Sequence, residues 1–453
     1  MTVAVPEAGA TRALARYTVA SSFEALPAPV VHEARRAIVN WAGCAIGASA
    51  HPTVERAWQA VAPFAGARQA SLLGRAERTD ILHAALVNGI SSHVFDFDDT
   101  HPVSLVHPSG PVASAVLALG EWRGVSGREL LNAFVTGVEV ECRVANAVLP
   151  AHYEVGWHIT ATAGIFGAAA ASARLLGLSE TQAVWALGLA ATQAAGLREM
   201  FGSMAKSLHP GRAAQNGLSA ALLAQANFTS AETGIEGKRG FANVLSTTVD
   251  VSRCTQGLGE QYELLQNTYK PYACGLVIHP AIDGCVQLRS APGVTPEAIE
   301  RIDLEVHPLV LELTGKTQPR TGLEGKFSVA HSAAVAVLDG AGGEAQFSDR
   351  RVNAPEVVAL RQKVHVCVDP ALALEAANVK FTLQDGTIRE RRIAHCSGSR
   401  QQPLTDQQLD DKFRAQCVGV LGAGRTEAAL ALLRRLETLR DVQACALACT
   451  LVA

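Results

Sequence analysis

The spacing of the apolar residues constrains the fold of this chain more than any other feature. From Thr11 to about residue 250, apolar residues recur at helical spacing in segments rich in alanine and leucine, separated by glycine and proline. One helix is predicted to open at a capping box, Ser179-Glu180-Thr181-Gln182, and to run to about Ala195, with Gly196 ending it. From Thr405 onward the helical spacing returns. Both ends of the chain are therefore predicted to be helical.

Between these helical parts the apolar residues alternate with period two, which is typical of half-buried strands. Strands are predicted over 302–306, 364–368 and 378–383, and the last enters a hairpin turn. Helices are predicted over 328–338 and 355–363. The sequence thus predicts a mainly α protein with an inserted α+β domain. Residues 1–266 and 403–453 are predicted to form one discontinuous helical domain, and residues 267–402 the smaller α+β domain.

The composition and charge bear on the partners of the protein. Of 453 residues, 48% are apolar and 18% are charged, which predicts a large buried interior. The formal net charge of −3 provides no field to attract nucleic acid or an anionic membrane, so an anionic substrate needs a local cationic pocket. We find no membrane-spanning run and no signal segment, and we expect a cytoplasmic protein. Abundant alanine and glycine with low charge favour an extensive subunit interface, and we expect a homodimer.

The ten cysteines are scattered and form no CxxC pair. This pattern predicts reduced, mostly buried thiols. Cys445 and Cys449 lie one helical turn apart, so they are predicted to face one core.

The stretch HVFDFDDTHPVSLVHPSG, residues 93–110, concentrates histidine and aspartate in an apolar chain. If residues 93–100 end a helix, His93, Asp96 and Thr100 share one face. Such a group could cap the helix, bind magnesium or transfer protons. Magnesium is disfavoured because the chain has no second Asp-rich ligand set and no Gly-rich phosphate loop, so we expect no metal. His101 is assigned to the structure of the turn.

Further polar clusters follow along the chain. His158 lies at the predicted start of a helix, where a neutral imidazole is favoured. A second cluster precedes a helix predicted from about Ala213 to Ala226, whose first amides would suit a carboxylate. A third lies at the predicted domain junction. The side chains of these two clusters are Lys206, His209, Arg212, Lys270 and His279.

These residue types suit proton transfer on a polycarboxylate. Removing a proton from a carbon next to a carboxylate builds charge on that group, and nearby cations lower the barrier. Lys206, Lys270 and Arg212 could supply the cations. His107 or His158 suits the base, and an aspartate with a pKa raised by burial suits the acid. No Rossmann, Walker or nucleophile-elbow motif is present.

Six motifs in order resemble the MmgE/PrpD family, which includes 2-methylcitrate dehydratase, cis-aconitate decarboxylase and iminodisuccinate epimerase. They are DFDDTH with HPSG downstream, GWHITATAG, KSLHPGRAAQNG, KPYACGLVIHPAID, GKFS and PLTDQQLDDKF, and the resemblance spans residues 11 to about 440. It implies a helical domain with an α/β lid domain, a homodimer, a site between the domains and no cofactor. By motif, the resemblance places site residues at Asp96, Thr100, His107, His158, Lys206 and Lys270. His93, His209, Arg212 and His279 form a second tier of substrate-binding candidates.

The resemblance and the residues together predict a cofactor-independent lyase of a small di- or tricarboxylate, most similar to 2-methylcitrate dehydratase. In the predicted mechanism Lys206 and Lys270 bind carboxylates, His107 or His158 removes the α-proton, and Asp96 with Thr100 orients or protonates the leaving hydroxyl. Decarboxylation of cis-aconitate is disfavoured, because the decarboxylase branch has a histidine five residues after the second motif lysine and this chain has Gly275 there. An epimerase of an iminodisuccinate-type dicarboxylate is the alternative, and a non-catalytic carboxylate-binding protein is the second alternative.

Overall fold

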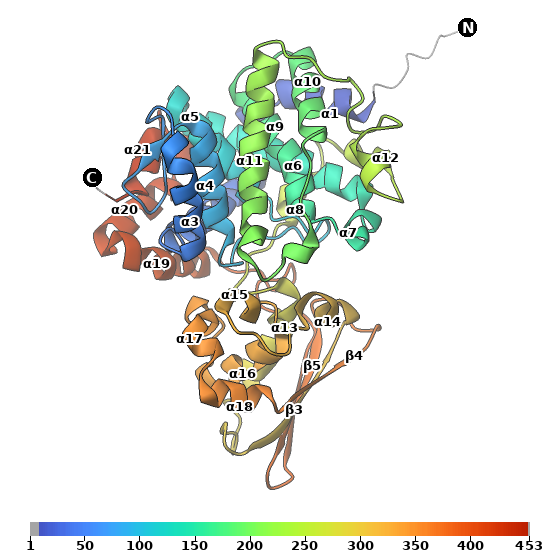
Figure 1. Cartoon of the computed structure of the whole chain (residues 1–453), viewed down its shortest axis with the longest axis vertical. Helices are drawn as coiled ribbons and strands as arrows, with labels where there is room; N and C mark the ends of the chain where they lie inside the picture. Colours follow the sequence, from blue (N-terminus) through green and yellow to red (C-terminus); the bar gives the residue numbers. More distant parts are fainter. Residues whose placement is uncertain (1–8, 452–453) are drawn as a thin grey trace.

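A body of helices forms the larger part of the structure, a computed structural model that describes residues 9–451 (Figure 1). Its helices are α1 (Ala10–Ala20), α2 (Ala28–Gly47), α3 (Pro52–Val61), α4 (Ile81–His93), α5 (Ser109–Arg123), α6 (Gly127–Val148), α7 (Ala151–Val155), α8 (Ile159–Thr162), α9 (Gly164–Leu175), α10 (Glu180–Ala191), α11 (Met204–Gln225), α12 (Phe241–Leu245), α19 (Asp406–Leu421), α20 (Ala423–Arg434) and α21 (Gln443–Ala448). A two-stranded hairpin, β1 (Ala70–Ser71) with β2 (Arg78–Thr79), precedes α4. Within residues 9–451, none of the helices combines the length and the apolarity that a bilayer span requires.

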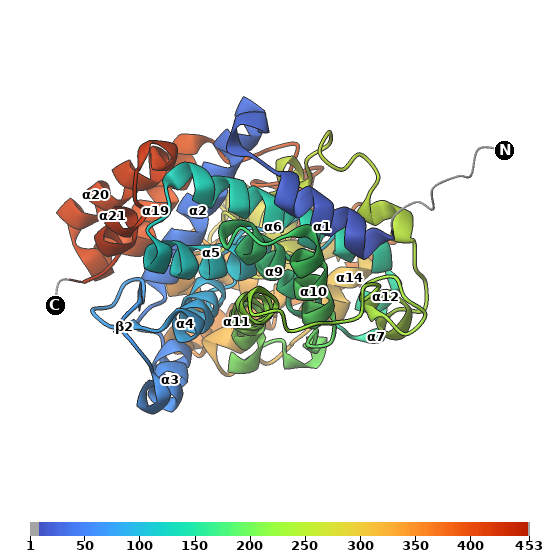
Figure 2. The same cartoon turned by 90° about the horizontal axis from the view of Figure 1, so that it is seen from above.

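Helix α11 lies at the centre of the body. It packs against α4, α9 and α10, and Figure 2 shows it almost end-on among them. The C-terminal helices return to this body, and α19 packs along α2 (Figure 2). The side chain of Arg36 in α2 donates to the backbone oxygen of Leu404 at 2.6 Å, which ties the returning segment to α2.

The smaller α+β domain hangs below the helical body in Figure 1, and is called the lid domain here. Its strands β3 (Ile299–Val306), β4 (Val364–Val368), β5 (Ala377–Leu383) and β6 (Ile388–Ile393) form a sheet in the order β4-β3-β5-β6. Strand β4 runs parallel to β3, whereas β5 is antiparallel to both β3 and β6. Its helices are α13 (His279–Leu288), α14 (Pro308–Thr314), α15 (Gly322–Gly325), α16 (Val329–Asp339), α17 (Asp349–Val352) and α18 (Pro355–Arg361). The prediction of a mainly α protein with an inserted α+β domain is thus confirmed.

The alternation along the strands separates a buried face from an exposed one. Ile302, Leu304 and Phe381 are fully buried and belong to one apolar core with α13 and α16. The cysteines also follow the prediction, because nine of the ten are buried and only Cys367 is exposed. Cys445 and Cys449 lie in the same core of the helical body.

The predicted end of α10 is wrong. Helix α10 begins at the Ser179 capping box but ends at Ala191, not near Ala195. The residues beyond it pair with a distant segment instead, because Trp157 and Leu197 form a backbone bridge and His158 N–H donates to the oxygen of Gly196 at 3.0 Å. This pairing takes the place of a further helical turn after Ala191 and holds His158 next to Gly196.

Candidate active site

Two glycines allow α4 and α11 to approach closely enough for their side chains to meet. A Cβ atom at Gly211 would lie 2.4 Å from the backbone oxygen of Leu86, and one at Gly89 would lie 2.6 Å from the Cα atom of Gly211. Because both positions lack a side chain, the helices touch backbone to backbone. His93 at the end of α4 and Lys206 in the first turn of α11 consequently meet, with 2.9 Å between Nε2 and Nζ.

Helix α4 ends at His93, so the prediction that residues 93–100 continue a helix is wrong. The chain turns at Asp96, whose φ of 50° lies in the left-handed region that aspartate tolerates better than most residues. Further on, Thr100 pairs with Thr268 through two backbone hydrogen bonds of 2.9 Å. This bridge, and not a helix, fixes the loop beside the segment that carries Lys270.

The carboxylate of Asp96 lies between two ammonium groups. Lys206 Nζ and Lys270 Nζ each donate to Asp96 Oδ1 at 2.9 Å, and Lys270 also donates to the Asp96 backbone oxygen at 3.1 Å. All three side chains are buried. Since Lys206 also contacts His93, each ammonium has two of its three N–H groups engaged among the described residues and one left to bind a ligand.

The charges of this triad are set by mutual contact. Burial alone would raise the pKa of Asp96, but Lys206 and Lys270 hold it well below its usual value. Burial lowers the pKa of Lys206, whereas Asp96 and Asp98 outweigh burial at Lys270 and raise its pKa. Asp96 is therefore an anion and cannot be the proton donor, which contradicts the prediction that burial raises the pKa of the site aspartate. Burial does raise the pKa of Asp99, to about 7, but Asp99 does not line the pocket.

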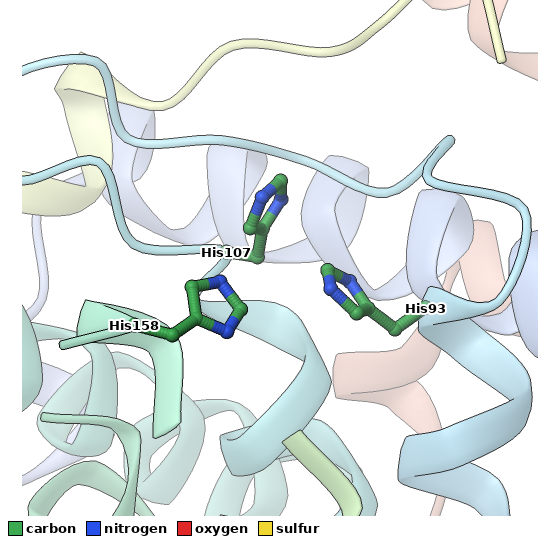
Figure 3. A group of neighbouring side chains, drawn as sticks. All are labelled: His93, His107 and His158. Carbon is green, nitrogen blue, oxygen red and sulfur yellow. The ribbon is translucent and has the colours of Figure 1, made fainter. Parts of the chain in front are cut away.

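Three imidazoles gather beside the triad (Figure 3). The ring centroids of His93 and His107 are 4.8 Å apart, and those of His107 and His158 are 6.4 Å apart. Burial lowers the pKa of His107 to about 3, and burial together with His209 and Lys206 holds the pKa of His158 well below its usual value. Both rings are therefore neutral near neutral pH, and each keeps one unprotonated ring nitrogen.

Hydrogen bonds determine the tautomer of His107. Its Nδ1 lies 2.9 Å from the backbone oxygen of Asp99, and a carbonyl oxygen only accepts. The hydrogen of the neutral ring is thus on Nδ1, and Nε2 keeps its lone pair. For His158 the tautomer stays open, because its Nδ1 faces Nδ1 of His209 at 2.7 Å and either ring can donate.

The histidines and aspartates also form a group with the spacing of metal ligands. In each of two overlapping groups the potential ligand atoms lie within 4.8 Å of one another. One group is His93, His107 and His158, and the other is His93, Asp96, Asp98 and His107. These atoms are already engaged, however. His93 Nδ1 lies 2.7 Å from Asp98 Oδ2, and Asp96 Oδ1 accepts from both lysines. A divalent ion here would have to displace or lie beside two ammonium groups, so the donor set fits an ion-pair network better than a metal site.

The six residues predicted for the site all line one pocket between the helical body and the lid domain: Asp96, Thr100, His107, His158, Lys206 and Lys270. Two of the second-tier residues, His93 and His209, lie directly behind them and contact Lys206 and His158. His101 holds the turn as predicted, because its Nδ1 lies 2.7 Å from Ser104 Oγ.

Arg212 and His279 do not lie in this pocket, so their prediction as substrate-binding residues is not supported by their positions. Arg212 is exposed on α11 and bonds to Gln215 on the same helix. His279 is buried against the ring of Tyr272. The predicted helix from about Ala213 is also wrong: α11 begins at Met204 with Pro210 inside it, so no free amides are exposed near Ala213.

Sequence reasoning missed Lys412 in α19. Its ammonium donates to Asn40 Oδ1 at 2.8 Å, to the Phe97 backbone oxygen at 2.7 Å and to the Lys270 backbone oxygen at 2.8 Å. It also lies 3.8 Å from the centroid of the Phe97 ring. The signals available were the motif PLTDQQLDDKF, which ends on Lys412 and Phe413, and the position of this lysine next to a buried phenylalanine of α19. Lys412 thereby supports the backbone on both sides of the triad.

Comparisons with known proteins identify a family and several relatives. Residues 12–253 match a family model described as the MmgE/PrpD N-terminal domain, and residues 272–438 match the MmgE/PrpD C-terminal domain. The cis-aconitate decarboxylase of Homo sapiens is 29% identical over 378 residues, which cover 79% of this chain and 77% of that protein. That of Mus musculus is 30% identical over 380 residues, covering 79% and 76%. The cis-aconitate decarboxylase of Aspergillus terreus is 25% identical over 468 residues, covering 96% and 95%.

Proposed function

Because this chain belongs to the MmgE/PrpD family, we propose that it is a lyase acting on a small di- or tricarboxylate, as the decarboxylase relatives are lyases. Within that class we propose a cofactor-independent hydro-lyase of the 2-methylcitrate dehydratase type. The observation that carries the proposal is the buried Lys206–Asp96–Lys270 triad next to a neutral His107 with a free Nε2.

The lysines bind and activate the substrate. Each has one remaining N–H for a substrate carboxylate. Lys270 holds its proton more tightly than Lys206 because its pKa is raised. Charge that builds on the carboxylate oxygens during proton abstraction is stabilised by these fixed donors in a buried site. Asp96 keeps the two ammonium groups together without donating a proton.

The elimination transfers two protons. His107 Nε2 removes the proton next to the carboxylate, and the C–H electron pair forms the double bond as the C–O bond breaks. The leaving hydroxide takes a proton from Lys206, whose lowered pKa makes it a better acid than a free lysine. Water leaves, His107 is protonated and Lys206 is neutral, and return of the proton from His107 to Lys206 resets the site.

Gly275 favours elimination of water over decarboxylation. It lines the pocket at the position where the resemblance to the decarboxylase branch predicts a histidine. A Cβ atom there would lie 3.2 Å from Thr314 Cγ2, so the lid domain already occupies the adjacent space. The pocket therefore offers no imidazole on that side.

An epimerase is the second candidate. His107 and His158 are both neutral and face each other across 6.4 Å, which suits removal of an α-proton on one face and its return on the other. Such an enzyme would exchange the α-proton of iminodisuccinate with solvent without losing a group.

The deciding experiment is an NMR screen in heavy water of citrate, 2-methylcitrate, cis-aconitate and iminodisuccinate with purified protein. We expect loss of water from 2-methylcitrate. Deuterium uptake into unchanged carbon skeletons would instead identify an epimerase, carbon dioxide release from cis-aconitate would identify a decarboxylase, and thermal shifts without turnover would indicate a binding protein.

Substitutions test the roles within the site. Lys206→Ala, His107→Gln and His158→Ala are expected to lose about 10²–10⁴-fold in kcat. Lys206→Ala also loses stability because it removes one partner of a buried ion pair, so kcat is compared for the folded protein. The exposed Lys238→Ala and His365→Ala serve as matched controls and should retain full activity. Turnover like that of the unchanged protein in any of the three site variants would remove that residue from the mechanism.

A further inference from the structure

The two walls of the pocket have opposite chemistry. The helical body supplies most of the charged and polar side chains, and Lys270 lies in the segment that leads into the lid domain. The lid domain supplies most of the apolar lining, and five of its aliphatic side chains form what is called the apolar wall here: Leu276, Val277, Leu309, Leu313 and Leu374. Leu309 and Leu313 lie one turn apart on α14 and both reach the pocket, while Leu311 between them is exposed at 39%. The apolar wall is therefore one face of a helix, joined by residues of two loops.

The lid domain brings no free cation to this wall. The only lysines or arginines that line the pocket within residues 9–451 are Lys206 and Lys270, and both contact Asp96. Lys326 of the lid domain is buried and pairs with Glu344. A carboxylate pressed against the leucines would lose its water without gaining a partner, which disfavours binding.

The ionised side chains around Asp96 also limit the negative charge that the pocket can accept from a substrate. Two lysines are balanced by Asp96 and by Asp98, whose pKa His93 and His107 hold below its usual value despite burial. The neutral histidines add no charge. The remaining N–H groups of Lys206 and Lys270 can therefore bind one or two carboxylates, and the rest of the substrate must lie against the apolar wall.

The apolar wall borders a second cavity. Leu276, Val277 and Leu374 line both cavities, and the second is also lined by Val103 of the loop after α4 and by Glu375 and Arg400 of the lid domain. A substituent that extends beyond the three shared side chains would meet this second cavity.

We propose that these leucines and Val277 form a subsite for an alkyl substituent, so that the protein acts on carboxylates whose chain is longer than a methyl group. The inference rests on the proposed lyase function and narrows its substrate class. Each methylene placed on the wall is expected to raise kcat/KM about 4-fold, from the usual free energy of burying a methylene group.

The test uses 2-alkylcitrates and 3-alkylmalates that carry hydrogen, methyl, propyl or pentyl. We expect kcat/KM to rise from methyl to propyl in both series, and the dissociation constants measured by calorimetry to fall in parallel. Leu313→Ser should flatten this dependence on chain length, and the neighbouring exposed Leu311→Ser should leave it unchanged.

The outcomes separate the two proposals. Turnover that is best for hydrogen or methyl, with no gain in affinity for longer chains, would overturn the alkyl subsite while the lyase function stands. A chain-length dependence of affinity without turnover of any compound would overturn the lyase function and retain the subsite. An unchanged dependence in Leu313→Ser would also overturn the subsite.

Discussion

Asp96 is the residue on which the site depends most directly. It combines a left-handed backbone, which directs its carbonyl and its carboxylate to the same side, with contacts to two buried ammonium groups. Without this anion, two like charges would face each other in a medium of low dielectric constant. The residue thus serves both the fold and the chemistry.

Asp96→Asn should therefore destabilise the protein by about 3–5 kcal/mol, as removal of one partner from a buried ion pair usually does. An added dicarboxylate should raise the melting temperature of Asp96→Asn more than that of the unchanged protein, because the ligand replaces the lost anion. Differential scanning calorimetry with and without the dicarboxylate measures the loss of stability and the rise in melting temperature.

Asp250→Asn, at an exposed aspartate, is the control. A ligand-induced rise in melting temperature that is equal in Asp96→Asn and Asp250→Asn would contradict the role assigned to Asp96.

The buried histidines predict how stability depends on pH. Burial lowers the pKa of His107 to about 3 in the folded state, while the unfolded chain has a value near 6.5, so acid favours unfolding. The contribution of the neutral His107 to the free energy of unfolding is fully present above pH 6.5 and falls progressively as the pH drops toward 3. His107 alone should account for about 2 kcal/mol lost between pH 7 and pH 5.

Urea unfolding at the two pH values measures this loss. His107→Gln should show a smaller dependence on pH than the unchanged protein, and the exposed His365→Gln should show the same dependence. A stability that is constant from pH 7 to pH 5 would show that His107 is not neutral in a buried position.

At the level of elements, the contact between α4 and α11 positions the site. The close approach at Gly89 and Gly211 brings His93 to Lys206, and Lys206 lines the pocket. A side chain at this crossing would separate the two helices, because the nearest atoms belong to the backbone and cannot move aside.

Gly211→Ala should thus lower the free energy of unfolding by about 1–3 kcal/mol and reduce turnover, since Lys206 moves relative to Asp96. Gly419→Ala is a helical control with open space around it, and it should gain up to about 1 kcal/mol from helix propensity. Chemical denaturation and steady-state kinetics of both variants provide the comparison. Full activity of Gly211→Ala would show that the close approach is not required.

At the level of the whole molecule, Lys412 joins parts that are far apart in the sequence. From α19 it reaches α2, the loop after α4 and the segment of Lys270. A helix of the C-terminal segment thereby holds the backbone next to a site built by the middle of the chain. This contact is a physical reason for the discontinuous helical body.

Lys412→Met keeps the length of the side chain but leaves two backbone oxygens without this donor. We expect a loss of about 1–3 kcal/mol in stability and a fall in kcat, with KM changed less. Gln407→Met, exposed on the same helix, is the matched control. If stability falls while kcat is retained, Lys412 supports the fold and not the site.

The predictability of the molecule differs between its parts. The helices and strands, the capping box at Ser179 and the return of helix after Thr405 follow from local spacing and hydrogen-bonding groups, and these were located correctly. The ends of α4 and α10 and the start of α11 were placed wrongly. At the first two, backbone pairing with distant segments decided the boundary. At the third, buried Pro210 packs against Gly110 of α5 inside the helix, where sequence alone favours a break.

Residue types and motifs are local properties, so the sequence alone predicts the periodicity of each segment, the mainly α class with its inserted α+β domain, and six of the side chains that line the pocket. The folded structure was needed to show that two lysines keep the pKa of Asp96 low, that the hydrogen of His107 is on Nδ1, and that Arg212 lies elsewhere. The leucines of α14 and the support from Lys412 also emerge only there. Charge, tautomer and pocket lining depend on which atoms lie within a few ångströms, and the folded chain draws those atoms from segments hundreds of residues apart.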